Sequence, residues 1–237
     1  MDSELLVIPG DLISVKFDAN NVVLGPGVCI SKKDNESIIP TSAGILQLQE
    51  KKNQNYIYIE SNNKRYIPSM GDYVVGTVTG VFGDYFKISL SNFQSSVILS
   101  TMAFPNASKK NRPNLKNGDL VYARVSSCFK DIDVEIECID PTTGKDGGFG
   151  LLEGGYVFEV KLGYARWLFF DKQNPLLEIL ASKCKFEIAI GINGKIWLKT
   201  DDLKTTLACS TIIENCQFLK QQDFNTEINK VFKKLNI

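Results

Sequence analysis

Four carboxylates alternate along one short segment, Asp131-Ile132-Asp133-Val134-Glu135-Ile136-Glu137. Carboxylates gathered around two divalent metal ions can catalyse phosphodiester hydrolysis, so the segment suggests a metal-dependent ribonuclease. In a strand, however, alternate side chains share one face, and these four would point the same way without ligands from other elements. We therefore favour a strand with an acidic, solvent-exposed face, and keep the metal-dependent ribonuclease as an alternative function.

Other catalytic groups are scarce in this sequence. It contains no histidine, which removes the commonest general base and the commonest metal ligand, and excludes Ser-His-Asp and Cys-His catalysis within the chain. Six cysteines are present and none forms a CxxC pair, which favours reduced, packed thiols over a zinc site or a disulfide framework. We expect no catalytic residue, no metal ligand and no cofactor.

The charges are balanced overall but not locally. The chain has 27 basic and 27 acidic residues, yet residues 64–126 carry eight basic and three acidic ones. A connector within this region, residues 101–113, contains two prolines, which argue against a central strand, and it carries Lys109, Lys110 and Arg112. The pattern indicates a focused site for a polyanion.

Alternating apolar residues predict two β-rich domains. Residues 1–63 show short strands separated by turns, with no helical period, and predict an N-terminal β domain. Residues 64–150 predict five strands, the first of them over residues 73–82, and these suit a small closed barrel of the OB type. Two of these strands begin with the same pattern, at Gly71-Asp72 and at Gly118-Asp119. In each, glycine permits the turn and aspartate can bond the local backbone. A glycine-rich segment, residues 147–150, is the predicted linker.

The remaining residues, 151–237, predict an α+β domain. A strand, two helices, a hairpin and two further helices follow one another, and the first helix is expected over residues 162–170. The hairpin alternates on both sides of Asn193-Gly194. An Asn-Gly pair between alternating runs predicts a two-residue type I′ turn. The expected fold class is therefore multidomain, mainly β plus α+β.

These motifs together resemble a known family. Gly71-Asp72-x-Val74-x-Gly76-x-Val78 resembles the opening of S1-type RNA-binding barrels. The run from Gly191 to Trp197 resembles the GxNG-bearing KH domain of the cap subunits of the RNA exosome. The connector Met102–Pro113 is similar to the same subunits. The likeness covers essentially the whole chain: N-terminal β domain, barrel and KH-type domain.

The resemblance implies a non-catalytic RNA-binding subunit. Such subunits sit on a ring of subunits that resemble phosphorolytic ribonucleases, beside other cap subunits and associated nucleases. They stabilise the ring and guide single-stranded RNA into its channel for 3′-to-5′ processing and decay. It also implies a location in nucleus, nucleolus and cytoplasm. The acidic start of the chain and the lack of a membrane-length apolar run agree with this expectation. A free-standing adaptor for single-stranded RNA is a further alternative.

The resemblance also assigns candidate site residues. Lys109, Lys110 and Arg112 are expected to contact RNA phosphates. Tyr85 is a candidate for base stacking, whereas Phe82 and Phe86 are expected in the barrel core. Weaker basic candidates are Lys87, Lys116 and Arg124.

The glycine-containing motif has two interpretations. A Gly-x-x-Gly loop between helices clamps RNA backbone in many KH domains. Here strands flank the motif, so we assign it a structural role, as the resemblance also implies. Its residues are Gly191, Asn193, Gly194 and Trp197.

Overall fold

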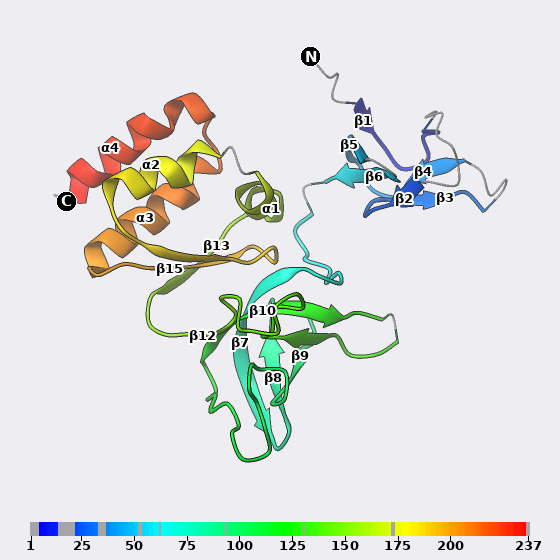
Figure 1. The fold of residues 1–237 in the computed structure, drawn as a ribbon. Coiled ribbons are helices and arrows are strands. Elements are labelled where there is room, and N and C mark those ends of the chain that lie inside the picture. Colours follow the sequence, from blue (N-terminus) through cyan, green and yellow to red (C-terminus); the bar gives the residue numbers. More distant parts are fainter. Residues whose placement is uncertain are drawn as a thin grey trace. The chain divides into compact units, whose positions relative to one another are not determined.

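The computed structural model describes residues 5–13, 22–32, 37–51, 54–61, 63–92, 94–129, 131–171 and 174–235. The chain divides into two compact units, Met1–Asn63 and Lys64–Ile237, which are described separately below (Figure 1). Among the described helices, none combines the length and hydropathy needed to cross a bilayer.

The N-terminal unit is built from strands alone. One four-stranded sheet has the order β1-β5-β6-β2, and a separate hairpin pairs β3 with β4. Its small core is apolar and centres on Ile57 and Ile59. The strands are β1 (Leu5–Val7), β2 (Val22–Leu24), β3 (Val28–Ile30), β4 (Ile38–Pro40), β5 (Gly44–Lys51) and β6 (Gln54–Glu60).

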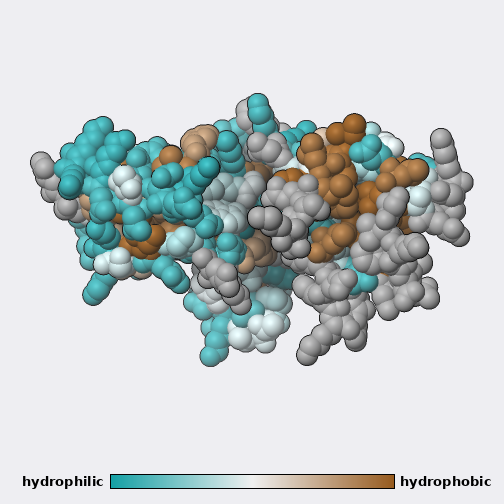
Figure 2. All heavy atoms as spheres, turned by 90° about the horizontal axis from the view of Figure 1, so that it is seen from above, coloured by the Kyte–Doolittle hydropathy of each residue, from teal (hydrophilic) through white to brown (hydrophobic). Residues whose placement is uncertain are grey.

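Several large apolar side chains of this unit are exposed. Figure 2 shows hydrophobic colour gathered over the described part of this unit. The exposed side chains around β1 are Leu5, Leu6, Ile8 and Leu12.

The second unit begins with a closed five-stranded barrel. The strands pair in the order β11-β9-β8-β7-β10, and an additional β10–β11 pairing closes the sheet. The β9–β11 pair is parallel and the others are antiparallel. This is the OB-type barrel that the sequence predicts. The strands are β7 (Tyr73–Phe82), β8 (Tyr85–Ser89), β9 (Val97–Ser100), β10 (Leu120–Ser127) and β11 (Glu135–Glu137).

The two Gly-Asp turns at the starts of β7 and β10 are structurally equivalent. The Asp72 carboxylate accepts from the Ser69 amide at 3.1 Å, and the Asp119 carboxylate accepts from the Lys116 amide at 2.7 Å. Both glycines have positive φ, +89° at Gly71 and +94° at Gly118, which side chains with a Cβ rarely adopt. The expected bond between each aspartate and its local backbone is present.

The predicted linker at residues 147–150 is part of the barrel. Phe149 is buried in the barrel core, and Gly150 opens strand β12 (Gly150–Leu152), which pairs with β10. Glycine richness alone suggested a linker, but three of these residues are glycines with positive φ in a tight turn. The turn directs Phe149 inward, so the barrel sheet extends to Leu152.

The rest of the second unit forms an α+β fold. A three-stranded sheet has the order β13-β15-β14, and its helices share a core with one face of that sheet. The other face lies against the barrel through Val75, Ala189 and Trp197. The elements are β13 (Tyr156–Glu159), α1 (Leu162–Phe170), α2 (Pro175–Lys183), β14 (Glu187–Ile190), β15 (Lys195–Lys199), α3 (Leu203–Cys216) and α4 (Phe224–Leu235).

Candidate nucleic-acid interface

An exposed aromatic pair marks the tip of the β7–β8 hairpin. Phe82 and Tyr85 are 47% and 37% exposed, and their rings stack with centroids 5.6 Å apart and planes 18° from parallel. The Lys87 ammonium lies 5.1 Å from the centroid of the Phe82 ring. Exposed aromatic faces beside a cation are the features that single-stranded nucleic acids use for stacking and charge neutralisation.

The assignment of Phe82 to the core is wrong, whereas Phe86 is buried as expected. Even-numbered residues of β7 face the core from Val74 to Val78, so simple alternation places Phe82 inside. A bulge between Val78 and Gly80 breaks that alternation. The Phe82 ring then folds back over Gly80, where a Cβ would lie 2.6 Å from its Cε2.

The basic connector is an ordered turn next to this hairpin. Ser108 and Asn111 exchange both backbone hydrogen bonds, each 3.0 Å long, and so close a tight turn whose central residues are Lys109 and Lys110. Both lysines are exposed. Their ammonium groups are thus available to phosphate without the cost of burial.

Arg112 joins the connector to the hairpin tip. Its guanidinium lies 2.8 Å from the Asp84 carboxylate and donates to the Gly83 carbonyl at 3.2 Å. The structure therefore brings Tyr85, Lys87 and Arg112 together around one hairpin tip. Lys116 instead belongs to the turn that begins β10.

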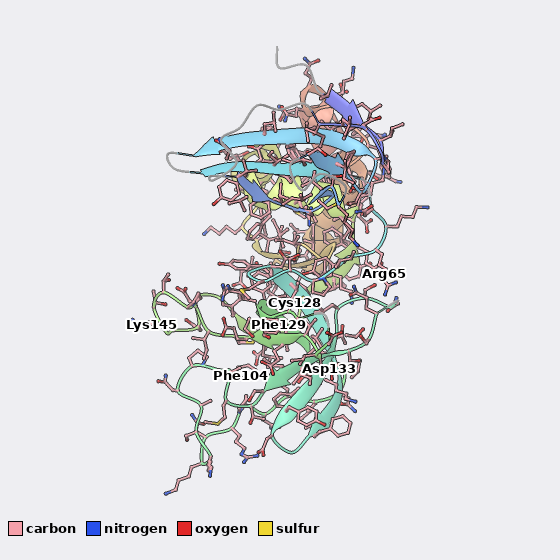
Figure 3. The ribbon with its side chains drawn as sticks, turned by 90° about the vertical axis from the view of Figure 1, so that its right-hand side faces the viewer. Arg65, Phe104, Cys128, Phe129, Asp133 and Lys145 are labelled. Carbon is pink, nitrogen blue, oxygen red and sulfur yellow. The ribbon has the colours of Figure 1, made fainter. Side chains whose placement is uncertain are left out.

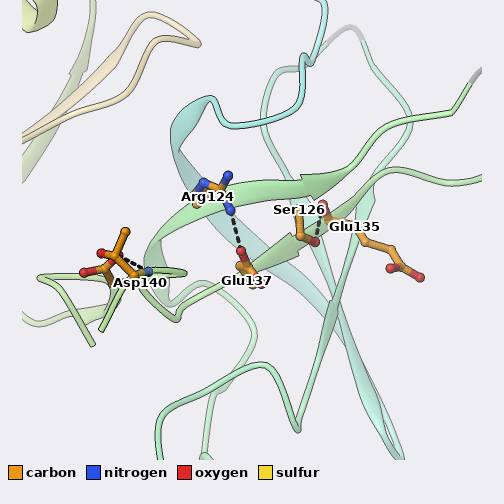
Figure 4. Close-up of polar contacts among 6 residues, drawn as sticks. Arg124, Ser126, Glu135, Glu137 and Asp140 are labelled. Atoms are coloured by element: carbon orange, nitrogen blue, oxygen red, sulfur yellow. Dashed lines mark hydrogen bonds and ion pairs between the residues drawn. The ribbon is translucent and has the colours of Figure 1, made fainter. Parts of the chain in front are cut away.

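The acidic segment is mostly loop, which corrects the predicted strand from Asp131 onward. Only Glu135–Glu137 is strand, with Ile136 buried between its two glutamates. The Glu137 carboxylate is paired with Arg124 at 2.7 Å, and the Ser126 hydroxyl donates to the Glu135 carbonyl (Figure 4). This ion pair engages the guanidinium of Arg124, which was a weaker candidate for phosphate contact, and so makes it less available to RNA. No group of three or more His, Cys, Asp or Glu suited to a metal occurs among the described residues.

Residues 191–194 form a hairpin turn, but not of type I′. Gly194 has φ +82°, whereas Asn193 is not among the residues with positive φ. The Gly194 amide donates to the Gly191 carbonyl, and the Gly191 amide donates to the Lys195 carbonyl. This is the longer hairpin loop in which a turn is followed by a left-handed glycine.

The reason for this turn is the buried Asn193 amide, which docks on the barrel. Its Nδ2 donates to the carbonyls of Val75 and Leu90, both at 2.9 Å, and its Oδ1 accepts from the Val75 amide at 3.1 Å. Strand β8 ends at Ser89, opposite Thr77, so Val75 lies beyond its last partner on that strand. Asn193 supplies the hydrogen bonds that a longer β8 would make.

Neighbouring residues fit the same contact. The Ile192 amide donates to the Tyr73 carbonyl at 2.8 Å, and the Ile192 side chain joins the barrel core. A Cβ on Gly191 would lie 2.8 Å from the Val75 nitrogen, so only glycine allows this approach. The Trp197 indole is buried at the same junction and donates to the Gly154 carbonyl at 2.7 Å.

The position of an RNA clamp in this fold is the connection between α1 and α2. That connection reads Asp171-Lys172-Gln173-Asn174 and contains no glycine; Lys172 and Gln173 lie outside the described residues. The packed GxNG turn lies instead between β14 and β15, and the side-chain amide of its asparagine is hydrogen-bonded to the barrel. These observations support a structural role for the motif.

Comparison with known protein families covers all three parts of the chain. Residues 22–65 match the family described as the N-terminal domain of exosome complex exonuclease Rrp40. Residues 66–150 match the S1 domain of exosome complex component RRP40, and residues 155–204 match a KH domain family.

Individual proteins give the same result. The chain is 48% identical to exosome complex component RRP40 of Saccharomyces cerevisiae, over 97% of this chain and 96% of that protein. It is 38% identical to the Schizosaccharomyces pombe protein of that name, over 96% and 94%. A solved structure described as an exosome complex RNA-binding protein has a similar fold, with a TM-score of 0.57 and 19% identity; the match covers 72% of this chain and 97% of that one.

Proposed function

Because the chain belongs to the RRP40 family of exosome complex components, we propose that it binds single-stranded RNA within an exosome and does not cut it. The observation that carries the proposal is the stacked pair of Phe82 and Tyr85, exposed beside Lys87. Stacking on aromatic rings tolerates any base, and basic side chains neutralise the backbone. The proposed surface therefore guides RNA of any sequence rather than selecting one.

The proposed absence of catalysis rests on the chain's own residues. The sequence has no histidine, and Glu137 of the acidic segment is neutralised by Arg124. The description of one matched family includes the word exonuclease, so the point needs a direct test. Purified chain incubated with labelled RNA and Mg²⁺ or Mn²⁺ should leave the RNA intact. Cleavage that disappears in the Asp133→Asn, Glu135→Gln double variant would refute the proposal.

The proposed partners are ring subunits resembling phosphorolytic ribonucleases, with other cap subunits and nucleases around them. The exposed leucines and isoleucine near β1 support this part of the proposal, because contiguous apolar surface commonly marks a protein interface. Recovery of the chain from cells as a monomer, rather than in a complex of many subunits, would favour the free-standing adaptor.

The RNA surface can be tested by fluorescence anisotropy with the assembled complex and a labelled single-stranded RNA. Loss of one stacking ring costs about 1–3 kcal/mol per base, so Phe82→Ala and Tyr85→Ala should each weaken binding roughly 5- to 150-fold. Phe170→Ala is the control, because Phe170 is also exposed (65%) but lies on α1. Equal affinities for all four proteins would exclude the hairpin tip as the RNA surface.

A further inference from the structure

An open pocket of about 590 Å³ lies between the basic connector and the loop after β11. Neither the matched families nor the hairpin-tip surface accounts for it. Figure 3 shows Phe104 and Lys145, which line the pocket, on these two neighbouring segments of the chain. A volume in this range suits a small organic ligand or one unit of a polymer.

The connector side of the pocket is rigid and carries amide groups. Asn106 has φ +56°, a left-handed conformation that costs free energy in a residue other than glycine. It is held in place because the Asn111 side chain donates to its carbonyl at 3.4 Å, while the Ala107 amide donates to the Phe104 carbonyl at 3.2 Å. The wall therefore exists before any ligand arrives.

The opposite wall is a compact turn organised by Asp140. Its carboxylate accepts from the hydroxyls of Thr142 at 2.6 Å and Thr143 at 2.8 Å, and these bonds lower the pKa of Asp140. The Asp140 amide donates to the Lys145 carbonyl at 2.8 Å. The backbone of Lys145 is thus fixed at the pocket wall, next to Asp146.

Arg112 connects this pocket to the hairpin tip. It lines the pocket and also bonds Gly83 and Asp84, the two residues between Phe82 and Tyr85. An RNA strand stacked on Phe82 and Tyr85 therefore reaches the pocket by passing Arg112. Lys145 is a cation that suits phosphate, and Arg112, although paired with Asp84 through Nη1, has further N–H groups to donate. The carboxylate of Asp146 suits a hydrogen-bond donor such as a ribose hydroxyl or a base amino group.

We propose that this pocket is a nucleotide subsite, which holds one unit of the RNA strand next to the unit stacked on Phe82 and Tyr85. The inference rests on the proposed RNA-binding function and extends it to Lys145 and Ala107. Lys145 contacts the phosphate, and the nucleotide fills the space beside Ala107 and the two prolines of the lining, Pro105 and Pro113.

Two variants test the subsite in different ways. Lys145→Ala removes a charge; it should weaken RNA binding about 3- to 10-fold and lower the slope of log affinity against log salt by about 0.7. Lys204→Ala, an exposed lysine on α3, is the control and should change neither. Ala107→Phe fills the pocket without changing charge and should also weaken binding, with an unchanged melting temperature showing that the fold is intact.

The position of the RNA can be mapped in the same complex. A 4-thiouridine RNA should crosslink to peptides from residues 104–113 and 140–150, and Ala107→Phe should reduce this crosslink. Wild-type affinity for both variants, with binding still weakened by Phe82→Ala, would overturn the subsite and leave the proposed function intact. Wild-type affinity for all variants, Phe82→Ala included, would overturn both.

Discussion

The side-chain amide of Asn193 determines the type of turn between β14 and β15. Its three hydrogen bonds reach residues 118 and 103 positions earlier in the chain. The same Asn-Gly pair in a free hairpin would need positive φ at both residues. Here the docking of the Asn193 side chain determines the backbone conformation, and of the two residues only Gly194 has positive φ. Local sequence therefore predicted the hairpin but not its turn type, because the deciding partner lies in another part of the unit.

The prediction for this residue concerns stability. Asn193→Ala leaves the Val75 amide and two carbonyls buried without their partner, and should cost about 2–4 kcal/mol of unfolding free energy. Asn193→Asp should cost more, because a carboxylate would face the carbonyls of Val75 and Leu90. Urea denaturation measures both, with the exposed Asn225→Ala as control. An RNA clamp would behave differently: normal unfolding with weakened RNA binding.

Lys195 gives a prediction of pH dependence. Its side chain is buried in β15, and this burial lowers the pKa of its ammonium, an effect that Glu159 partly opposes. Between the lowered pKa and the ordinary value of 10.5, the unfolded chain binds more protons than the folded one. Unfolding free energy should therefore rise with pH in that window.

Lys195→Met removes this titration. The variant should be about 1 kcal/mol more stable than the wild type at pH 7, because a buried charge is replaced by an apolar chain of similar length. The unfolding free energy of the variant should also stay constant over the pH range in which that of the wild type rises. Urea titrations from pH 7 to 10 check both points, with Lys204→Met as control. A less stable variant at pH 7 would show that the charge has a favourable partner in the fold.

At the scale of elements, the two Gly-Asp turns fasten β7 and β10 to each other. The Val125 amide donates to the Asp72 carbonyl, and the Val78 amide donates to the Asp119 carbonyl, both at 2.8 Å. The repeated pattern in the sequence therefore corresponds to a repeated contact, in which the turn before each strand bonds the other strand.

The two aspartates should nevertheless differ in their contribution. Asp119→Ala removes one exposed hydrogen bond and should cost about 1 kcal/mol. Asp72→Ala should cost more, about 2–3 kcal/mol, because Asp72 also accepts from the Tyr66 hydroxyl at 2.7 Å, and Tyr66 is buried. Urea denaturation of both single variants and the double variant gives the costs and their additivity. Equal costs would mean that the Tyr66 contact contributes nothing to stability.

The elements also show what the sequence could and could not predict. Strand β7 has its predicted bounds, Tyr73–Phe82, and helix α1 has its own, Leu162–Phe170, because their apolar patterns are long and local. The strand predicted over the acidic segment is limited to Glu135–Glu137. Alternation favours a strand but does not supply a neighbouring strand to pair with. Exposure of Phe82 likewise depends on the bulge between Val78 and Gly80. A glycine inside a strand often marks a bulge, so Gly80 was the signal that simple alternation overlooked.

At the scale of the molecule, the barrel and the KH-type domain should unfold as one cooperative body. Polar contacts cross the junction through Asn193, Ile192 and Tyr122, and a shared apolar cluster includes Val75 and Trp197. Contacts of this kind couple neighbouring elements into one unit of exchange.

Hydrogen exchange of the full chain, read by peptide, tests this coupling. Slowly exchanging peptides from β7 and from β15 should report the same opening free energy in the wild type. In the Asn193→Ala variant the two opening free energies should differ, and the junction should open at a lower free energy than the barrel core. Different values already in the wild type would show that the two domains open independently.

The docking of Asn193 also has a consequence for the chain as it is made. Residues 118 positions apart complete one row of hydrogen bonds. At a synthesis rate of about 5–20 residues per second, the ribosome needs roughly 6–24 s to extend the chain from Val75 to Asn193. For that interval the beginning of β7, at Val75, has exposed, unpaired backbone groups, which are open to pairing with another chain. The barrel of a nascent chain is thus finished only by a segment that arrives long after its last strand.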